Sequence, residues 1–153
     1  MIGIETIVEG EAWPRALPQA EELARRVFEA ASAREPKLGG EIALLLADDE
    51  KLQSLNQRFR GKDAPTNVLS FPSGAPAPAF LGDIALAYET CAREAQEKQA
   101  SLSDHAAHLI AHGLLHLVGY DHMDEAEARL MERLETEILD AIGVSNPYED
   151  EVD

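Results

Sequence analysis

The strongest constraint in this sequence is a set of three histidines near the end of an apolar segment, His112-Gly-Leu-Leu-His116-Leu-Val-Gly119-Tyr-Asp-His122. His112 and His116 are four residues apart, so on a helix their imidazoles lie on one face, one turn apart. Gly119 permits the positive φ that ends a helix and reverses the chain, and this reversal would bring His122 to the same place. The pattern therefore predicts a helix anchored in the core whose end gathers three imidazoles.

Three converging imidazoles predict a metal site. Burying them together with no ion to satisfy them would be costly. Three protein ligands leave a fourth position for water, which is typical of a catalytic rather than a structural zinc site. A bound metal lowers the pKa of that water to about 7 and so supplies hydroxide at neutral pH. We therefore expect one divalent metal ion, zinc, held by His112, His116 and His122, although histidine sites also accept nickel or copper.

Two neighbouring side chains could support these ligands without binding the metal. His108 lies four residues before His112 and would share its helix face, either as a supporting group or as a proton carrier. Asp121 could orient a ligand histidine, or it could simply form the turn. His105, at the start of the same helix, is interpreted as a surface histidine without a role.

Hydrophobic periodicity predicts an α+β fold in which about five helices flank a small mixed sheet of about four strands. The strands are expected at 2–8, 41–47, 66–71 and 81–88. The helices are expected from Pro14 or Pro18 to 34, from Asp48 or Asp49 to 59, and at 89–99, 103–118 and 124–142, with Ser103 as a cap.

The length of 153 residues suits a single hydrolase-like domain spanning 1–153, with an acidic and flexible tail from about 145 to 153. No apolar run approaches the ~20 residues that span a bilayer, and the N-terminus lacks the features of a secretory signal. Cys91 is the single cysteine, which excludes an intrachain disulfide and a thiolate-rich zinc site. These features predict a cytoplasmic protein that does not associate with membranes.

The net charge of −16 argues against a general nucleic-acid binder, because neutralising phosphates requires cations. The charge is unevenly distributed, however. Residues 121–153 carry 12 acidic and two basic side chains, whereas residues 51–72 carry four basic side chains against one acidic. This second segment is either an ordinary basic loop or a small anion-binding area on an acidic protein, and the charge pattern alone does not separate the two.

The histidine spacing coincides with that of the metzincin proteases, H-E-x-x-H-x-x-G-x-x-H. The three histidines and the glycine align, but Gly113 replaces the glutamate that serves these proteases as general base. A peptidase would therefore need another carboxylate near the metal. Asp83, Glu89 and Asp121 are the candidates for that role.

The segment from His112 to His122 also resembles the signature of the YbeY family of bacterial metal-dependent endoribonucleases, which take part in ribosomal RNA maturation. Two other stretches are similar to motifs of that family: Asn56 to Pro72, which contains Arg60-Gly-Lys-Asp63 and Thr66-Asn-Val-Leu-Ser-Phe71, and Leu81-Gly-Asp83-Ile84. The resemblance runs from about residue 48 to 139, well over half of the chain.

The resemblance implies an α+β fold and a metal, usually zinc, on the three histidines that match His112, His116 and His122. It implies that Arg60 is the functionally important arginine of the family. The implied activity is cleavage of single-stranded RNA in 16S rRNA 3′-end maturation and ribosome quality control. The implied partners are ribosomal RNA and ribosomal particles, with ribosomal proteins or an assembly GTPase as further candidates.

The chemistry of Arg60 agrees with this role, because a guanidinium offers planar, bidentate donors to phosphate and stays charged. Together with a metal it could stabilise the charge that develops on an attacked phosphodiester. Arg58 and Lys62 are weaker candidates for contacts with the RNA backbone. The nucleophile is either metal-bound hydroxide or the 2′-hydroxyl of the RNA. A non-enzymatic ribosome-assembly factor with a structural metal is the alternative from a different functional class.

Overall fold

The computed structural model describes residues 3–64, 66–73, 80–121 and 124–145. These residues form four strands and six helices, which confirms the α+β prediction with one helix more than expected. In chain order the elements are β1 (Gly3–Val8), α1 (Ala12–Ala16), α2 (Ala20–Arg34), β2 (Glu41–Ala47), α3 (Asp49–Arg60), β3 (Val68–Pro72), β4 (Phe80–Ala87), α4 (Tyr88–Glu97), α5 (Leu102–Leu117) and α6 (Glu125–Ala141).

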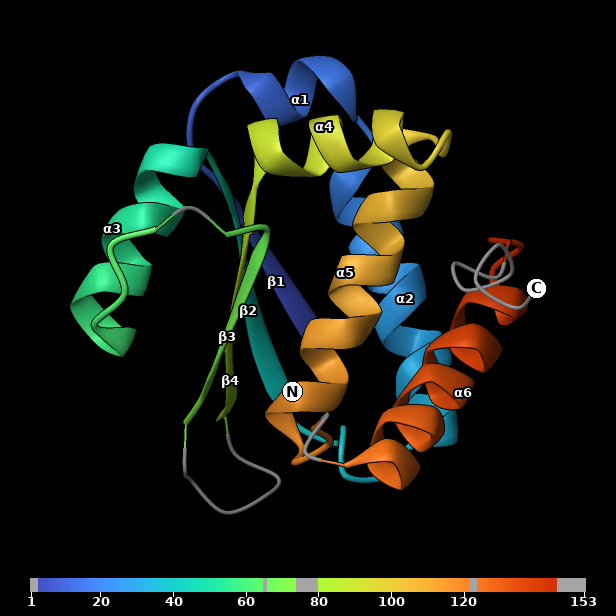
Figure 1. The fold of residues 1–153 in the computed structure, drawn as a ribbon. Coiled ribbons are helices and arrows are strands. Elements are labelled where there is room, and N and C mark those ends of the chain that lie inside the picture. The colour runs from blue at the N-terminus through green and yellow to red at the C-terminus, as the bar shows by residue number, and fades with distance from the viewer. Residues whose placement is uncertain (1–2, 65, 74–79, 122–123, 146–153) are drawn as a thin grey trace.

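The strands form one mixed sheet in the order β1-β2-β4-β3. The first three strands of this order run parallel, and β3 pairs antiparallel with β4 at the edge. Helices α2, α5 and α6 lie on one side of the sheet and α3 lies on the other, while α1 and α4 close one end (Figure 1). The edge strand β3 therefore separates α3, which carries Arg60, from α5, which carries His112 and His116.

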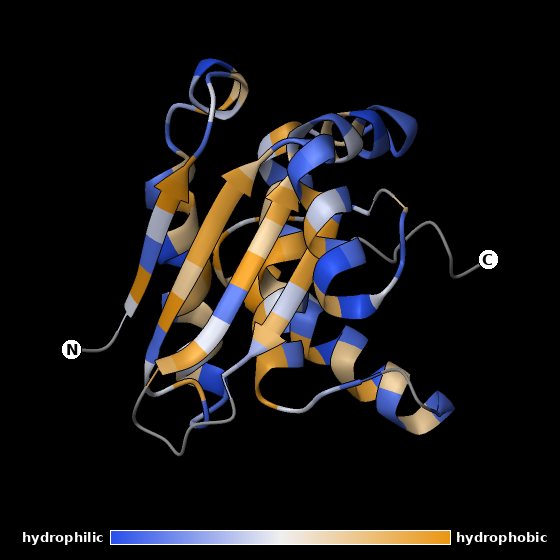
Figure 2. Cartoon of the chain, turned by 90° about the vertical axis from the view of Figure 1, so that its left-hand side faces the viewer, coloured by the Kyte–Doolittle hydropathy of each residue, from blue (hydrophilic) through white to orange (hydrophobic). Residues whose placement is uncertain are grey.

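The alternating faces of the strands give the sheet a core on each side. Leu44 and Ile84 belong to the larger core beneath α2 and α5, whereas Leu69 and Ala85 belong to a smaller core that includes Leu52 of α3. The strands are predominantly hydrophobic, and the helices carry both hydrophilic and hydrophobic residues (Figure 2). This pattern is expected when each helix buries only one stripe of its surface.

Helix α5 is buried over most of its length, so the histidines that it carries are anchored in the core. Its N-cap is Ser101, whose side chain accepts a hydrogen bond from the Asp104 N–H at 3.0 Å. The predicted cap, Ser103, is therefore wrong by two residues and lies within the first turn. The helix ends where predicted, because Gly119 adopts a φ of 103° that turns the chain away.

The segment expected to form one helix before residue 34 forms two, α1 and α2. Leu17 precedes Pro18, and the proline ring disfavours the helical conformation of the residue before it. Leu17 accordingly adopts φ −141° and ψ 73°, which separates the helices. The break turns Trp13 into the core, where its indole N–H donates to the Ala47 carbonyl at 2.9 Å.

Most residues of the predicted acidic tail, from 146 to 153, lie outside the described residues. Among the helices that the structure does describe, none combines the length and the apolar character needed to cross a membrane.

Candidate functional site

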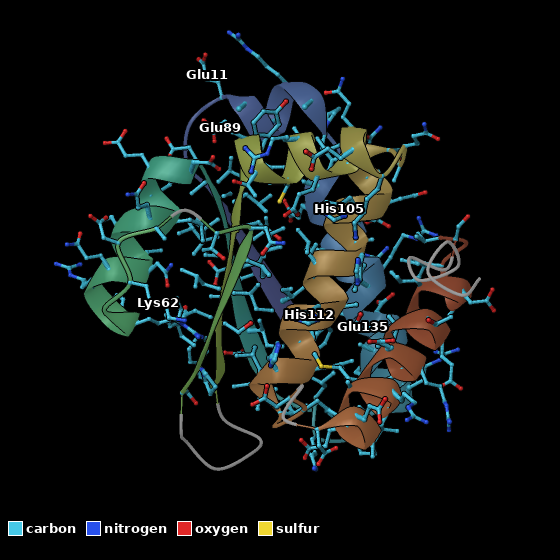
Figure 3. All side chains as sticks on the ribbon, in the orientation of Figure 1. Glu11, Lys62, Glu89, His105, His112 and Glu135 are labelled. Atoms are coloured by element: carbon cyan, nitrogen blue, oxygen red, sulfur yellow. The ribbon has the colours of Figure 1, made fainter. Side chains whose placement is uncertain are left out.

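Four histidines form a stripe along α5. They lie at positions 105, 108, 112 and 116, and residues three or four apart on a helix share a face. Figure 3 shows His105 and His112 on this helix, with Glu135 of α6 beside His112. At the C-terminal end of the stripe, the Nε2 atoms of His112 and His116 face each other at 3.0 Å.

A buried carboxylate holds the middle of this stripe. Glu135 of α6 is 0% exposed, and each of its two carboxylate oxygens is hydrogen-bonded to a different histidine. Oε1 lies 2.9 Å from His108 Nε2, and Oε2 lies 2.7 Å from His112 Nδ1. An ionised carboxylate can only accept, so it favours the His112 tautomer with the proton on Nδ1, in which the lone pair of Nε2 faces His116. Such histidine–carboxylate pairs orient the ligands of metal sites.

The donor set of His112 and His116 suits a divalent metal ion. Two nitrogens bound tetrahedrally at zinc distances lie about 3.3 Å apart, close to the separation of their Nε2 atoms. The third predicted ligand, His122, lies outside the described residues. Within the described ranges no group of three or more His, Cys, Asp or Glu side chains is placed to hold a metal. The structure therefore brings two of the three predicted ligands together.

Arg60 shares a cavity with His116. The cavity has a volume of about 520 Å³, and its lining also includes Lys62, Ser70 and Asp121. Arg60 Nη2 donates to the Ser70 carbonyl at 2.9 Å, and Ser70 Oγ donates to the Gly113 carbonyl of α5 at 3.3 Å. The edge strand thus connects the predicted catalytic arginine to the histidine helix. Arg58, the other arginine predicted to contact RNA, is exposed and does not line this cavity.

Gly113 packs against the sheet, and this packing bears on the protease alternative. A Cβ atom at this position would lie 3.0 Å from Ile84 Cγ2 and 3.1 Å from Ser70 Oγ. A glutamate would therefore have to enter the interface between α5 and the sheet. Of the three candidate substitutes for the protease base, Asp121 lines the cavity, whereas Asp83 and Glu89 do not. The packing of Gly113 therefore leaves no room for the protease glutamate at its usual place, and Asp121 is the candidate substitute base that the structure puts on the cavity.

A second cavity, of about 340 Å³, lies against the N-terminal half of the stripe. There His105 Nε2 lies 2.8 Å from Glu94 Oε1, and Asn67 Nδ2 donates to the same oxygen at 3.0 Å. Burial lowers the pKa of His105 against the opposing effect of Glu94. Burial alone would raise the pKa of Glu94, but the hydrogen bonds from Asn67 and His105 hold it below its ordinary value. His105 is buried, so the predicted surface position is wrong.

Glu135 is the site residue that sequence reasoning missed. Met131, Ile138 and Leu139 form the buried stripe of α6, and Glu135 occupies the turn between Met131 and Leu139. A carboxylate on an apolar stripe is the signal that could have identified it, because a buried charge requires partners. The predicted supporting group His108 binds this carboxylate, and the other one, Asp121, lines the cavity beside His116.

The comparisons with known proteins agree with one another. A family model described as Endoribonuclease YbeY matches residues 9–143. A protein of that name from Paramagnetospirillum magneticum is 49% identical over 90% of each chain, and one from Sphingopyxis alaskensis is 45% identical over 99% of each chain. A Thermotoga maritima protein solved in solution is 23% identical, with a TM-score of 0.60 over 91% of each chain, and it shows the same fold.

Proposed function

This chain belongs to the YbeY family of endoribonucleases, and we propose that it is a metal-dependent enzyme that cuts single-stranded RNA at the cavity between Arg60 and His116. One observation carries the proposal. A single cavity is lined both by Arg60 and by His116, whose Nε2 atom faces that of His112. A cationic group and paired nitrogen donors on one cavity suit phosphodiester chemistry, because charge develops on the phosphate oxygens during attack.

The chain's own residues would divide the work as follows. Glu135 keeps His112 in the tautomer whose Nε2 is available, and Arg60 binds the phosphate through guanidinium donors. A divalent ion on His112, His116 and the predicted third ligand His122 would supply Lewis-acid stabilisation and nucleophile activation. The nucleophile is water or the 2′-hydroxyl of the RNA. Products ending in 2′,3′-cyclic phosphate would identify the 2′-hydroxyl.

The proposed biological role is maturation of the 3′ end of 16S rRNA and ribosome quality control in the cytoplasm. The net charge of −16 opposes capture of free RNA by long-range attraction. We therefore propose that the enzyme works while docked on a ribosomal particle, with ribosomal proteins or an assembly GTPase supplying basic surface. Binding to the particle should weaken as salt rises, and binding independent of salt would contradict electrostatic recruitment.

The test is cleavage of an end-labelled RNA spanning the 3′ end of 16S rRNA, with and without ribosomal particles. Arg60→Ala and His116→Ala should each lower kcat/KM at least 100-fold. Arg34→Ala is the matched control, because Arg34 is an exposed arginine on α2. Equal cutting by all four proteins would show a contaminating nuclease. No cutting under either condition would favour a non-enzymatic assembly factor.

Metal content provides a second test. Purified wild-type protein should bind one equivalent of zinc, and His116→Ala should lose that binding. Chelation of the wild type should abolish cleavage, and added zinc should restore it. Cleavage that survives chelation, with no metal in the protein, would overturn metal dependence and leave the family membership intact.

A further inference from the structure

The C-terminal end of α3 presents an aromatic ring to solvent. Phe59 is 61% exposed, whereas Leu52 on the same helix is fully buried. A single exposed apolar side chain is common on proteins and needs no explanation. Phe59 differs because a second aromatic ring packs against it and a guanidinium group lies over it. Its ring packs edge-on against Phe71 of β3, with centroids 5.5 Å apart, and the Arg58 guanidinium lies 5.8 Å from its centroid.

The same packing connects Phe59 to the proposed active site. The Arg60 guanidinium lies 5.8 Å from the centroid of Phe71, so Arg60 and Phe59 contact one ring. Gly61, with a φ of 69°, ends the helix immediately after them, and its N–H donates to the Gln57 carbonyl at 3.0 Å. The same last turn of α3 therefore positions Arg60 in the lining of the cavity and Phe59 on the surface beside the cavity.

An exposed ring flanked by guanidinium groups suits an unpaired nucleobase. Proteins that bind single strands combine a cationic surface, which follows the phosphates, with aromatic side chains on which bases stack. The segment 51–72 supplies four basic residues against one acidic residue on a chain with a net charge of −16. We infer that Phe59 and Arg58 form a stacking platform for a base of the single-stranded RNA that enters the Arg60 cavity around the edge of β3. This inference rests on the proposed function.

A protein partner fits this surface less well. Protein interfaces centre on well-packed apolar anchors from which water is excluded. Phe59 instead lies between Arg58 and Arg60, close to Lys62, and such a cationic surface complements phosphate rather than apolar protein. The distinction is testable because stacking requires the base itself, whereas electrostatic contact requires only the phosphates.

Fluorescence can measure the contact directly. The chain has one tryptophan, Trp13, which is 1% exposed, so Phe59→Trp adds an exposed reporter to a buried background. The variant is combined with His116→Ala to prevent cleavage, and circular dichroism checks the fold. A short single-stranded RNA should quench this tryptophan, and the same RNA with abasic positions should not. Leu130→Trp on α6, where Leu130 is 44% exposed, is the matched control and should not respond.

Kinetics give a second readout that does not depend on the reporter. Phe59→Ala should raise KM for RNA roughly 5- to 150-fold with kcat little changed, which is the range expected from the loss of one stacked base. Phe59→Tyr should restore the wild-type KM. Equal quenching by intact and abasic RNA, or an unchanged KM in Phe59→Ala, would overturn the platform. No quenching by RNA would also overturn it and would favour a protein as the occupant.

The two proposals fail in different ways. If no protein cleaves RNA but intact RNA quenches the Phe59→Trp tryptophan selectively, the platform stands and the nuclease proposal fails. If wild type cleaves RNA and Phe59→Ala cleaves it with the same KM, the nuclease proposal stands and the platform fails.

Discussion

The two histidine–carboxylate pairs on α5 have similar distances and very different surroundings. His105 lies 2.8 Å from Glu94, and His112 lies 2.7 Å from Glu135. The Glu94 side chain is 28% exposed and binds one histidine, with Asn67 as its other partner. The Glu135 side chain is fully buried and binds two histidines, one of which faces His116.

If the proposed metal site exists, this difference in surroundings, and not the pair distance, separates the functional pair from the structural one. Glu94 joins α4 to α5 and to Asn67 in the loop before β3, so its hydrogen bonds connect three segments of the fold. Glu135 also joins two helices, but one of the imidazoles that it orients presents a second nitrogen to another imidazole. Metal sites commonly contain a buried carboxylate that binds one nitrogen of a histidine while the other nitrogen of that ring faces the metal position. Glu135 binds His112 in this way, and Nε2 of His112 faces His116.

Removing Glu135 should have the largest effect of the changes considered. Glu135→Ala removes the carboxylate that accepts from the buried His108 and the half-buried His112, and the loss of each such hydrogen bond costs about 1–3 kcal/mol. We expect the free energy of unfolding to fall by about 3 kcal/mol or more. Urea denaturation of the metal-free protein measures this loss, and competition with a chelator should show zinc affinity about 10- to 100-fold weaker.

Glu135→Gln separates packing from charge, because it keeps the shape of the side chain. It should recover much of the stability while zinc affinity remains reduced. Wild-type zinc affinity in Glu135→Gln would mean that the negative charge does not support His112, and the comparison with Glu94 would then lose its basis.

The same comparison explains which parts of the molecule could be predicted from the sequence. The spacing of His112 and His116, the terminating Gly119 and the strand patterns are local, so they predicted the histidine helix and the sheet correctly. Glu135 and Glu94 act on α5 from other helices. Their pairing depends on tertiary packing that a single sequence does not display, although the apolar neighbours of Glu135 mark it as unusual.

The errors near helix ends have a similar origin. Ser101 and Ser103 are both good N-caps by type, and the packing of α5 decides between them. The break between α1 and α2 was local, however, because the restriction that Pro18 places on Leu17 can be read from the sequence. The surface position predicted for His105 is wrong because α4 covers that end of α5 and supplies Glu94.

Removing Glu94 should cost less than removing Glu135. Its side chain is partly exposed, so water can replace some of the lost hydrogen bonds. We expect Glu94→Ala to lower the free energy of unfolding by about 1 kcal/mol and to leave zinc affinity unchanged. The measurements are those used for Glu135. A loss of zinc affinity in Glu94→Ala as large as that in Glu135→Ala would remove the functional distinction between the two pairs.

Acid should lower the free energy of unfolding through the burial of His105, by an amount smaller than the loss expected from removing Glu94. The pKa of His105 lies below its ordinary value of 6.5, so the unfolded chain takes up a proton first as the pH falls. The stability that neutral His105 contributes is therefore complete above about pH 6.5 and is lost as the pH falls below that value. Denaturation of wild type and His105→Gln at pH 7.5 and 5.5 should show the smaller acid loss in the variant. An equal loss in both would assign the acid sensitivity to other groups.

The smallest effect should appear in the chemistry of Cys91. Its thiol is fully buried on α4, with Sγ 3.9 Å from the Asn67 carbonyl, and burial raises its pKa above the ordinary value. Since the thiolate is the reactive form, alkylation in the native state requires local opening of α4. Asn67 contacts Cys91 through its carbonyl and Glu94 through its side chain. Glu94→Gln should therefore speed the alkylation of Cys91 a few-fold, whereas Glu135→Gln should leave the rate unchanged. Equal acceleration by both variants would mean that the two ends of α5 open together. The Glu94 and Glu135 pairs would then differ in their effect on zinc binding but not in their effect on local stability.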